Sequence, residues 1–501
     1  MKHQHRLSSA TALLLCILAM PGGAATVTID MDSTGQTIDG FGGFGAMRPW
    51  FGGSSTFWTD SWLNTVVDDI GMTMFRTEFY PLPDQQHDWN EQPPYWRALK
   101  AKADASGEPL RVIATVWTPP RQYKHRIEAG KDPYKYGYFN PEYYDEYADY
   151  LIDYIKKFRN ECGFDLYAIS PGNEVQVYHG WFNSCAWEPE HLGEFCVRLA
   201  RRLREEGLST RIYYGDDLYG AMHFMYAVKV DNRIYQDNAD TRNIVRACAM
   251  HYGDHGTDST VFRSYGALSR MRGRVAWNTE FGNGPNTWDD AFGKAVDIAW
   301  MLRHNYGAIV YWIIGPHPNS AQLEESLMPS DRMGPKAYTA KAFFRFIRPG
   351  AFYTHSTSSS ARLVPVVFRD PGRGKITIVL VNRSSSAQSV TLTGAELPAQ
   401  LDLYRTGSGK NCVKEGTVSS DGAIQVAAHQ IVTLEGEDVA VGVAPPRTRS
   451  MPVTSRGAVN EGFVDLRGRS LAPMSRHTGI AVLPQISRGR DTRARVTVRL
   501  P

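Results

Sequence analysis

The feature of this 501-residue chain that most restricts its fold is an alternation of two patterns between Gly40 and Gly350. Short apolar runs rich in β-branched and aromatic residues alternate with amphipathic stretches of helical period. We expect strands at 38–45, 72–79, 111–117, 165–170, 211–215, 247–252, 274–280 and 308–313. We expect helices at 142–157, 189–206, 288–304 and 335–346. Eight strand–helix alternations over roughly 300 residues predict an α/β fold of the (β/α)8, or TIM-barrel, class.

A different pattern follows Pro349-Gly350. Five shorter runs alternate apolar and polar residues, with Gly, Ser and Pro turns between them, at 362–368, 375–381, 389–392, 401–404 and 424–434. Such alternation is typical of an antiparallel β-sandwich. We therefore expect the barrel over residues 46–347 and an appended β-sandwich domain over 348–437. Residues 26–45 are expected to supply the first barrel strand and an earlier strand, 27–31, that pairs into the sandwich.

The first 25 residues have the pattern of a secretion signal. Lys2 and Arg6 form a charged start, an apolar stretch covers 10–20, and Gly23-Ala24-Ala25 offers the small residues of a cleavage site. The apolar stretch is shorter than the roughly 20 residues of a membrane span, and no later run is long and apolar enough. We therefore expect a signal peptide over 1–25, a secreted or periplasmic protein, and no membrane span.

The C-terminal segment 438–501 is rich in arginine. Eleven Arg and three acidic residues fall between Val441 and Pro501, so this stretch contributes +8 to a formal net charge of +3. It has no Trp or Tyr and only one Phe, which leaves little to build a core. We expect a disordered, solvated tail, with contact to an anionic surface as the alternative. The protein is expected to be a monomer that binds no nucleic acid.

The cysteines and the short motifs indicate neither a metal nor a cofactor. Cys16 lies in the expected signal peptide, and the other five of the six cysteines show no CxxC spacing, so a zinc site is not expected. In an exported protein one or two disulfides are possible, with Cys185 and Cys196 the nearest pair; buried unpaired thiols are the alternative. The chain has no HExxH, P-loop or EF-hand motif.

Two glutamates stand where an apolar strand meets a loop. Glu174 follows the fourth expected strand in Ala168-Ile-Ser-Pro-Gly-Asn-Glu-Val175, and Glu280 ends the seventh in Val275-Ala-Trp-Asn-Thr-Glu-Phe281. The carboxyl ends of barrel strands meet at one face of the fold, so these side chains are expected to face one another. Paired carboxylates are the minimal machinery for cleaving a glycosidic bond. The alternatives are an ion pair for Glu280 and a loop cap for Glu174.

Six further residues at strand ends are expected to bind substrate or tune the carboxylates: Asn173, Arg76, Trp117, His251, Tyr252 and Trp312. The guanidinium of Arg76 is expected to steady a carboxylate, with a salt bridge to Glu78 as the alternative. His251 or Tyr252 is expected to hydrogen-bond the nucleophile. Trp312 is expected under a sugar ring, although a core position is the alternative. The pair Asp216-Asp217 is interpreted as a solvated loop, with a cation site as the alternative.

These residues lie in motifs that resemble glycoside hydrolase family 30 between about Gln36 and about Leu434. The motifs are Thr37-Ile-Asp-Gly-Phe-Gly-Gly43, Val116-Trp-Thr-Pro-Pro120, Leu166-Tyr-Ala-Ile-Ser170, Asn173-Glu174, Ser184-Cys-Ala-Trp-Glu-Pro-Glu190, Trp277-Asn-Thr-Glu280 and Phe346-Ile-Arg-Pro-Gly350. The resemblance implies a retaining barrel enzyme with a split β-sandwich, Glu174 as acid/base and Glu280 as nucleophile.

The chain departs from the family pattern at three places. Val175 stands where the family usually has Pro after the acid/base, and His251 and Tyr252 are adjacent rather than separated by one residue. The stretch 314–320 lacks the arginine with which glucuronoxylan-specific members grip a glucuronate branch.

The expected function is a secreted retaining β-glycoside hydrolase acting on a polysaccharide or oligosaccharide (xylan, β-1,6-galactan or β-1,6-glucan). The alternative is a non-catalytic carbohydrate-binding protein on the same scaffold.

Overall fold

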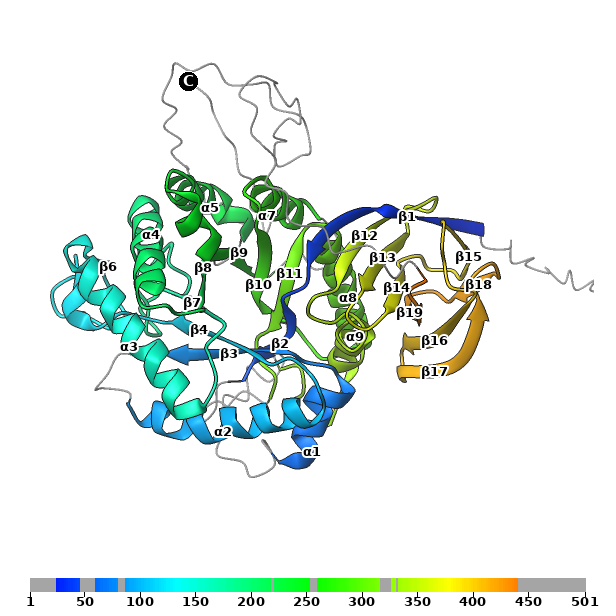
Figure 1. Ribbon diagram of the computed structural model, residues 1–501, viewed down its shortest axis with the longest axis horizontal. Coiled ribbons are helices and arrows are strands. Elements are labelled where there is room, and N and C mark those ends of the chain that lie inside the picture. The colour runs from blue at the N-terminus through cyan, green and yellow to red at the C-terminus, as the bar shows by residue number, and fades with distance from the viewer. Residues whose placement is uncertain are drawn as a thin grey trace, which may run out of the picture. The chain divides into compact units, whose positions relative to one another are not determined.

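The computed structural model describes residues 24–45, 59–79, 86–217, 220–252, 259–315, 326–329 and 332–439. These residues form a closed barrel and a mostly antiparallel β domain (Figure 1). The expected signal peptide up to residue 23, the tail from residue 440 onward and most of the stretch 314–320 lie outside them. No helix in the described ranges combines the length and hydropathy needed to cross a bilayer.

Eight parallel strands close the barrel in the order β10-β11-β2-β3-β4-β7-β8-β9. Their bounds are β2 Gly40–Phe44, β3 Met74–Phe79, β4 Arg111–Val116, β7 Ala168–Ser170, β8 Arg211–Asp217, β9 Val245–His251, β10 Val275–Phe281 and β11 Tyr306–Tyr311. Each overlaps one of the eight strands expected from the sequence, so the barrel class is confirmed. A short hairpin, β5 Lys124–His125 with β6 Tyr138–Phe139, stands outside the barrel sheet.

The helices that alternate with these strands include the four that were expected. They are α1 Asp60–Leu63, α2 Gln86–Ala105, α3 Tyr144–Cys162, α4 Pro189–Glu205, α5 Gly220–Tyr235, α6 Ala239–Ile244, α7 Thr260–Met271, α8 Trp288–Arg303 and α9 Pro335–Phe344. Local signals explain several ends: Pro189 opens α4 at its first position, and Thr287 caps α8 by accepting a hydrogen bond from the Asp290 amide. Helix α2 was not expected because it contains Pro93 and Pro94.

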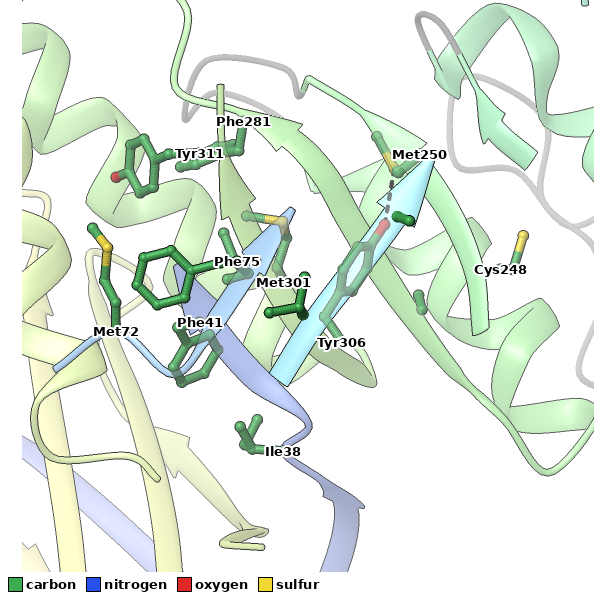
Figure 2. Packing of buried hydrophobic residues seen from close by; sticks show 14 of the residues in the cluster. Ile38, Phe41, Met72, Phe75, Cys248, Met250, Phe281, Met301, Tyr306 and Tyr311 are labelled. Carbon is green, nitrogen blue, oxygen red and sulfur yellow. Dashed lines mark hydrogen bonds between the residues drawn. The ribbon is translucent and has the colours of Figure 1, made fainter. Parts of the chain in front are cut away.

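Side chains of the barrel strands alternate between two apolar layers. Phe75 and Tyr311 point outward and pack against the helices (Figure 2), whereas Met74 and Ile113 belong to the cluster inside the barrel. Because the period of a strand is two residues, Arg76 continues the inward row that starts at Met74. The inward rows therefore change from apolar to polar toward the carboxyl ends of the strands.

The β domain is one nine-stranded sheet in the order β17-β16-β19-β14-β13-β12-β1-β15-β18. Its strands are β1 Ala24–Thr37, β12 Phe352–Ser358, β13 Leu363–Asp370, β14 Lys375–Asn382, β15 Gln388–Thr393, β16 Gln400–Gly407, β17 Lys410–Ser419, β18 Ile424–Val426 and β19 Gln430–Glu437. Strands from both ends of this order share one apolar cluster, so the sheet folds over on itself as a sandwich. The expected run 424–434 is two strands, and β12 and β17 were not expected.

Strand β1 joins the two parts of the chain. It pairs antiparallel with β12 and parallel with β15, and the chain then continues directly into barrel strand β2. The side chain of Gln36, near the end of β1, donates to the Leu302 carbonyl at 2.5 Å, at the end of α8. Thr433 of β19 donates to the Ala342 carbonyl of α9 at 2.8 Å. The split sandwich implied by the family resemblance is therefore present.

The five described cysteines are buried free thiols. Cys185 and Cys196 are not joined, and burial raises the pKa of each thiol to about 12. Thiols packed in this way behave as small apolar side chains. For the described residues the alternative of unpaired cysteines therefore holds, and the disulfide alternative does not.

Candidate active site

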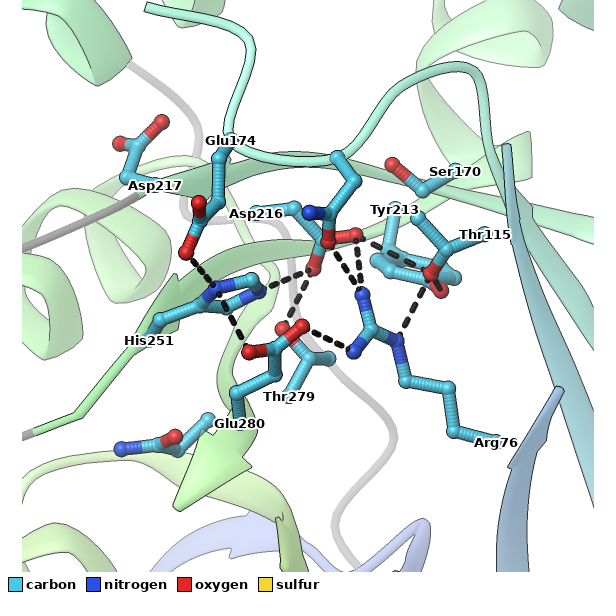
Figure 3. A network of polar contacts seen from close by, with 12 residues as sticks. Arg76, Thr115, Ser170, Glu174, Tyr213, Asp216, Asp217, His251, Thr279 and Glu280 are labelled. Carbon is cyan, nitrogen blue, oxygen red and sulfur yellow. Dashed lines mark hydrogen bonds and ion pairs between the residues drawn. The ribbon is translucent and has the colours of Figure 1, made fainter. Parts of the chain in front are cut away.

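Arg76 of β3 is the centre of a polar network at the carboxyl ends of the barrel strands (Figure 3). Its side chain is fully buried and reaches four neighbours: Nε donates to Thr115 Oγ1 at 2.8 Å, one terminal nitrogen to Glu280 Oε1 at 2.5 Å, and the other to Asn173 Oδ1 at 2.7 Å and Asp216 Oδ2 at 3.4 Å. The negative charges of Asp216 and Glu280 outweigh burial and raise the pKa of Arg76. This arginine is therefore a permanent cation beside the carboxylates.

His251, at the end of β9, lies between three carboxylates. Its Nδ1 is 3.1 Å from Glu174 Oε1 and 3.5 Å from Glu280 Oε2, and its Nε2 is 3.5 Å from Asp216 Oδ1. Burial alone would lower the pKa of His251, but the charge of Glu280 and the contacts with Asp216 and Glu174 raise it to about 10. The imidazole is therefore a second cation of the network at neutral pH.

The two glutamates expected to act together do face each other. One oxygen of Glu174, one oxygen of Glu280 and a ring nitrogen of His251 all lie within 4.8 Å of one another. Burial opposes ionisation of Glu174, but the contacts with His179 and His251 outweigh it and lower the pKa of this carboxyl to about 2. Burial raises the pKa of Glu280 although the charges of His251 and Arg76 oppose it. The substrate-free site thus gives the two carboxyls different proton affinities.

Irregular backbone aims these side chains. The register of β10 against β9 shifts between Asn278 and Glu280, so Thr279 and Glu280 both reach the network from neighbouring positions. Glu174 and Asp216 have φ angles of 48° and 44°, in the left-handed region that residues other than glycine rarely adopt. Such backbone costs free energy and collects at functional sites.

An aromatic cluster borders the network. Phe44, Trp117, Trp312 and Ile313 form one buried group, and Phe182 of the β7–α4 loop packs against it. The guanidinium carbon of Arg76 lies 4.8 Å from the centre of the Trp117 ring, and the Trp117 and Trp312 rings are 5.9 Å apart. Trp312 keeps 9% of its surface exposed. These rings offer apolar faces of the kind that the C–H face of a sugar ring packs against.

All eight residues predicted for the site lie at this end of the barrel. The structure brings Arg76, Asn173, Glu174, His251 and Glu280 into direct contact. The half-buried Tyr252 follows His251, and its backbone amide donates to the Glu280 carbonyl at 2.6 Å.

Sequence reasoning missed Thr115, His179, Tyr213, Asp216, Asp217 and Thr279. Thr115, Tyr213 and Thr279 continue the inward rows of β4, β8 and β10 and carry the alternation signal that would have found them, whereas the other three depend on loop course and irregular backbone.

The interpretation of Asp216-Asp217 as a solvated loop was wrong. Both side chains are fully buried at the end of β8. Asp216 accepts hydrogen bonds from Thr279 and, at 3.2 Å, from Thr115. Gly215, with a φ of 94°, permits the turn, because a Cβ there would lie 2.7 Å from the Ala249 carbonyl. The pair belongs to the site because its polar oxygens find donors there.

Asp217 predicts a pH dependence of stability. Burial raises its pKa from 3.8 to about 7, although Tyr265 donates to Oδ2 at 2.6 Å and Gln176 donates to Oδ1. The folded protein therefore holds this proton more tightly than the unfolded chain, and the resulting stability is lost as the pH rises from about 4 to about 7. Relative to Asp217→Asn, the unfolding free energy of the wild type should fall by roughly 2 kcal/mol or more between pH 5 and pH 8, then stay level.

Chemical denaturation of both proteins across this pH range measures that difference. A constant difference would show that Asp217 is ionised in the folded protein at pH 5.

The donor set fits a metal ion poorly. Glu174, His251 and Glu280 satisfy metal-ligand spacing among the described residues. However, Arg76 already forms an ion pair with Glu280 at 2.5 Å. The His251 nitrogen that faces both carboxylates carries a proton, because the pKa of this histidine is about 10. A metal ion would have to displace both positive groups.

Comparison with solved structures identifies the fold. A family 30 endoxylanase from Clostridium papyrosolvens C71 is 22% identical, with a TM-score of 0.65, and the alignment covers 82% of this chain and 100% of that one. A family 30 subfamily 8 xylanase from Clostridium acetobutylicum is 21% identical, with a TM-score of 0.66, over 82% of this chain and 99% of that one. An endo-β-1,6-glucanase is 18% identical, with a TM-score of 0.63, over 82% and 94% respectively.

No protein-family model matches the chain, and no curated protein matches its sequence. The described chain has the fold of glycoside hydrolase family 30 enzymes, a TIM-like barrel with a β domain. The resemblance seen in its motifs is thus confirmed at the level of the fold.

Proposed function

We propose that this protein is an exported retaining β-glycoside hydrolase that cleaves a β-linked polysaccharide or oligosaccharide. The observation that carries the proposal is the pair Glu174 and Glu280, whose oxygens lie within 4.8 Å at the carboxyl ends of two barrel strands. Retaining enzymes hold their carboxyl groups about 5–5.5 Å apart, whereas inverting enzymes leave about 6.5–9.5 Å for a water molecule. The spacing supports attack by one carboxylate on the sugar.

The partners of each glutamate support the roles. Glu280 accepts a hydrogen bond from Arg76, whose permanent positive charge favours the carboxylate form that would attack the anomeric carbon. Glu174 faces the imidazoles of His251 and His179. Glu174 would give its proton to the leaving oxygen and later take one from the water that releases the sugar.

The proton count of the site is consistent with this scheme. The carboxylates of Glu174, Asp216 and Glu280 face two cations, Arg76 and His251, and a buried net charge is costly. One more proton would neutralise the group. In the substrate-free site Glu174 has the lower pKa of the two glutamates, so the scheme requires this proton to reach Glu174 when substrate excludes water.

The solved structures similar to this one suggest which substrates to test. The similar proteins include xylanases and an endo-β-1,6-glucanase. We therefore favour a β-linked xylan or β-1,6-glucan, with β-1,6-galactan as a further candidate. Polymers of this kind lie outside the cell, which agrees with the secreted or periplasmic location expected from residues 1–25.

The test is product release from xylan, β-1,6-glucan and β-1,6-galactan, followed by proton NMR of the first-formed anomer. We expect one polymer to be cleaved with a β-anomer as first product. The double variant Glu174→Gln/Glu280→Gln, prepared in the same way, controls for contaminating enzymes. Binding to a polymer without any cleavage would instead indicate the carbohydrate-binding alternative, and a first-formed α-anomer would contradict the retaining mechanism.

A further inference from the structure

The loop between β7 and α4 brings a second histidine to Glu174. His179 Nε2 lies 3.0 Å from Glu174 Oε2, while the other oxygen, Oε1, lies 3.1 Å from His251 Nδ1. The His179 side chain is only 8% exposed. Each oxygen of this carboxylate therefore faces its own imidazole.

The loop holds His179 in this place through several contacts. Its amide donates to Ser184 Oγ at 2.8 Å, and Ser184 Oγ donates to the Lys135 carbonyl at 2.9 Å. Its ring stacks on Phe182 with centres 4.4 Å apart and planes 24° apart. Gly180, with a φ of 76°, lets the loop backbone lie close against Tyr136, because a Cβ on Gly180 would be only 2.5 Å from the Tyr136 phenol oxygen. The loop thus holds both the backbone and the ring of His179.

The two histidines differ in what they face. His251 contacts Glu174, Glu280 and Asp216, so changing it would disturb both glutamates. Among the ion pairs of the described residues, His179 reaches Glu174 alone. A change at His179 therefore acts on one of the two carboxyls and leaves the contacts of Glu280 in place.

We propose that His179 is a positioning residue for Glu174, which fixes its carboxyl and stabilises the carboxylate that remains after proton donation. This inference rests on the proposed function. In the first step the O–H bond of Glu174 breaks and its proton bonds to the glycosidic oxygen. The electrons of the breaking C–O bond stay on that oxygen, while an oxygen of Glu280 forms the new bond to the anomeric carbon. In the substrate-free protein the Nε2 of His179 is not aligned for a hydrogen bond, as is common before substrate binds.

The charged groups around Glu174 set the direction of the expected effect. His179 faces it from its own loop, His251 from β9 and Glu280 from β10, and the Glu174 amide donates to the Asp216 carbonyl of β8 at 3.1 Å. Burial raises the pKa of Glu174, and the two imidazoles lower it. Removing one imidazole should therefore raise this pKa and leave Glu174 a weaker acid.

A titration without substrate tests the inference. In protein labelled with carbon-13 at the glutamate carboxyls, the Glu174 signal is assigned by its absence in Glu174→Gln. We expect its midpoint to rise by about one pH unit in His179→Gln and in His179→Phe, which keeps the stacking on Phe182. His355→Gln, the same change at an exposed position of β12, should leave the midpoint unchanged. An unchanged midpoint in both folded His179 variants would overturn the proposal.

Kinetics on the polymer found in the panel give a second readout. His179→Gln should lower kcat by about 10- to 100-fold on the polymer, whose leaving group needs a proton. It should change kcat less than about threefold on the 2,4-dinitrophenyl glycoside of the same sugar, whose leaving group needs none. Equal losses on both substrates would contradict a role in proton donation. If the wild type cleaves nothing, the proposed function fails while the titration still decides whether His179 controls Glu174.

Discussion

Replacing Glu280 by Gln is expected to lower kcat by on the order of 10⁴-fold or more, because the variant lacks the carboxylate that attacks the anomeric carbon. The amide has nearly the same shape, and its oxygen can still accept the hydrogen bond that Arg76 makes at 2.5 Å. The change also removes a charge from a buried position. The fold should therefore persist, and circular dichroism with thermal unfolding verifies this before activity is measured.

The product formed with azide identifies the role of Glu280. In Glu280→Ala, with a 2,4-dinitrophenyl glycoside as substrate, azide can attack from the face that the shortened side chain leaves empty, which inverts the anomeric carbon. We expect an α-glycosyl azide from Glu280→Ala. Residual hydrolysis within about 100-fold of the wild type would show that Glu280 is not the nucleophile.

Replacing Glu174 by Gln is expected to lower kcat on the polymer by about 10²- to 10⁴-fold, the usual contribution of a general acid or base. Release of dinitrophenol, which needs no proton, should be much less affected in the first step. The glycosyl-enzyme on Glu280 should then accumulate, because no base activates the water. Pre-steady-state measurement should therefore show a burst of dinitrophenol followed by slow turnover.

Azide again gives the contrast between the two glutamates. In Glu174→Ala it replaces the water of the second step and should yield a β-glycosyl azide, the opposite anomer from that of Glu280→Ala. This comparison matters because Glu174 has the lower pKa in the substrate-free site, with a value of about 2. A β-azide from Glu280→Ala and an α-azide from Glu174→Ala would reverse the assignment.

The barrel could be predicted because its signal is local and repeated. Apolar strands such as 111–117 and 274–280 are bounded by loops, and their ends meet at one face in this fold class. That rule was enough to predict that Glu174, Glu280 and Arg76 lie at the same end of the barrel. It also placed Trp117 and Trp312 at the same end, where the structure has their rings 5.9 Å apart.

The remaining parts of the site depend on structure that alternation cannot describe. Asp216 points into the network only because the backbone turns into the left-handed region after Gly215. Glu280 joins the network beside its neighbour Thr279 because the register of β10 shifts between Asn278 and Glu280. His179 returns to Glu174 through contacts between two loops distant in sequence. Such positions follow from tertiary packing and carry no periodic signal.

The place of β1 in the sheet imposes an order on the assembly of the chain. Residues 24–37 leave the ribosome early, yet their partners in β12 and β15 are made more than 300 positions later. Contacts between such distant segments are slow to form, because a long loop must close first. The β domain therefore cannot assemble during synthesis of the barrel. Export, as proposed from residues 1–25, would benefit from this delay, because strand β1 stays unpaired until β12 and β15 have been made.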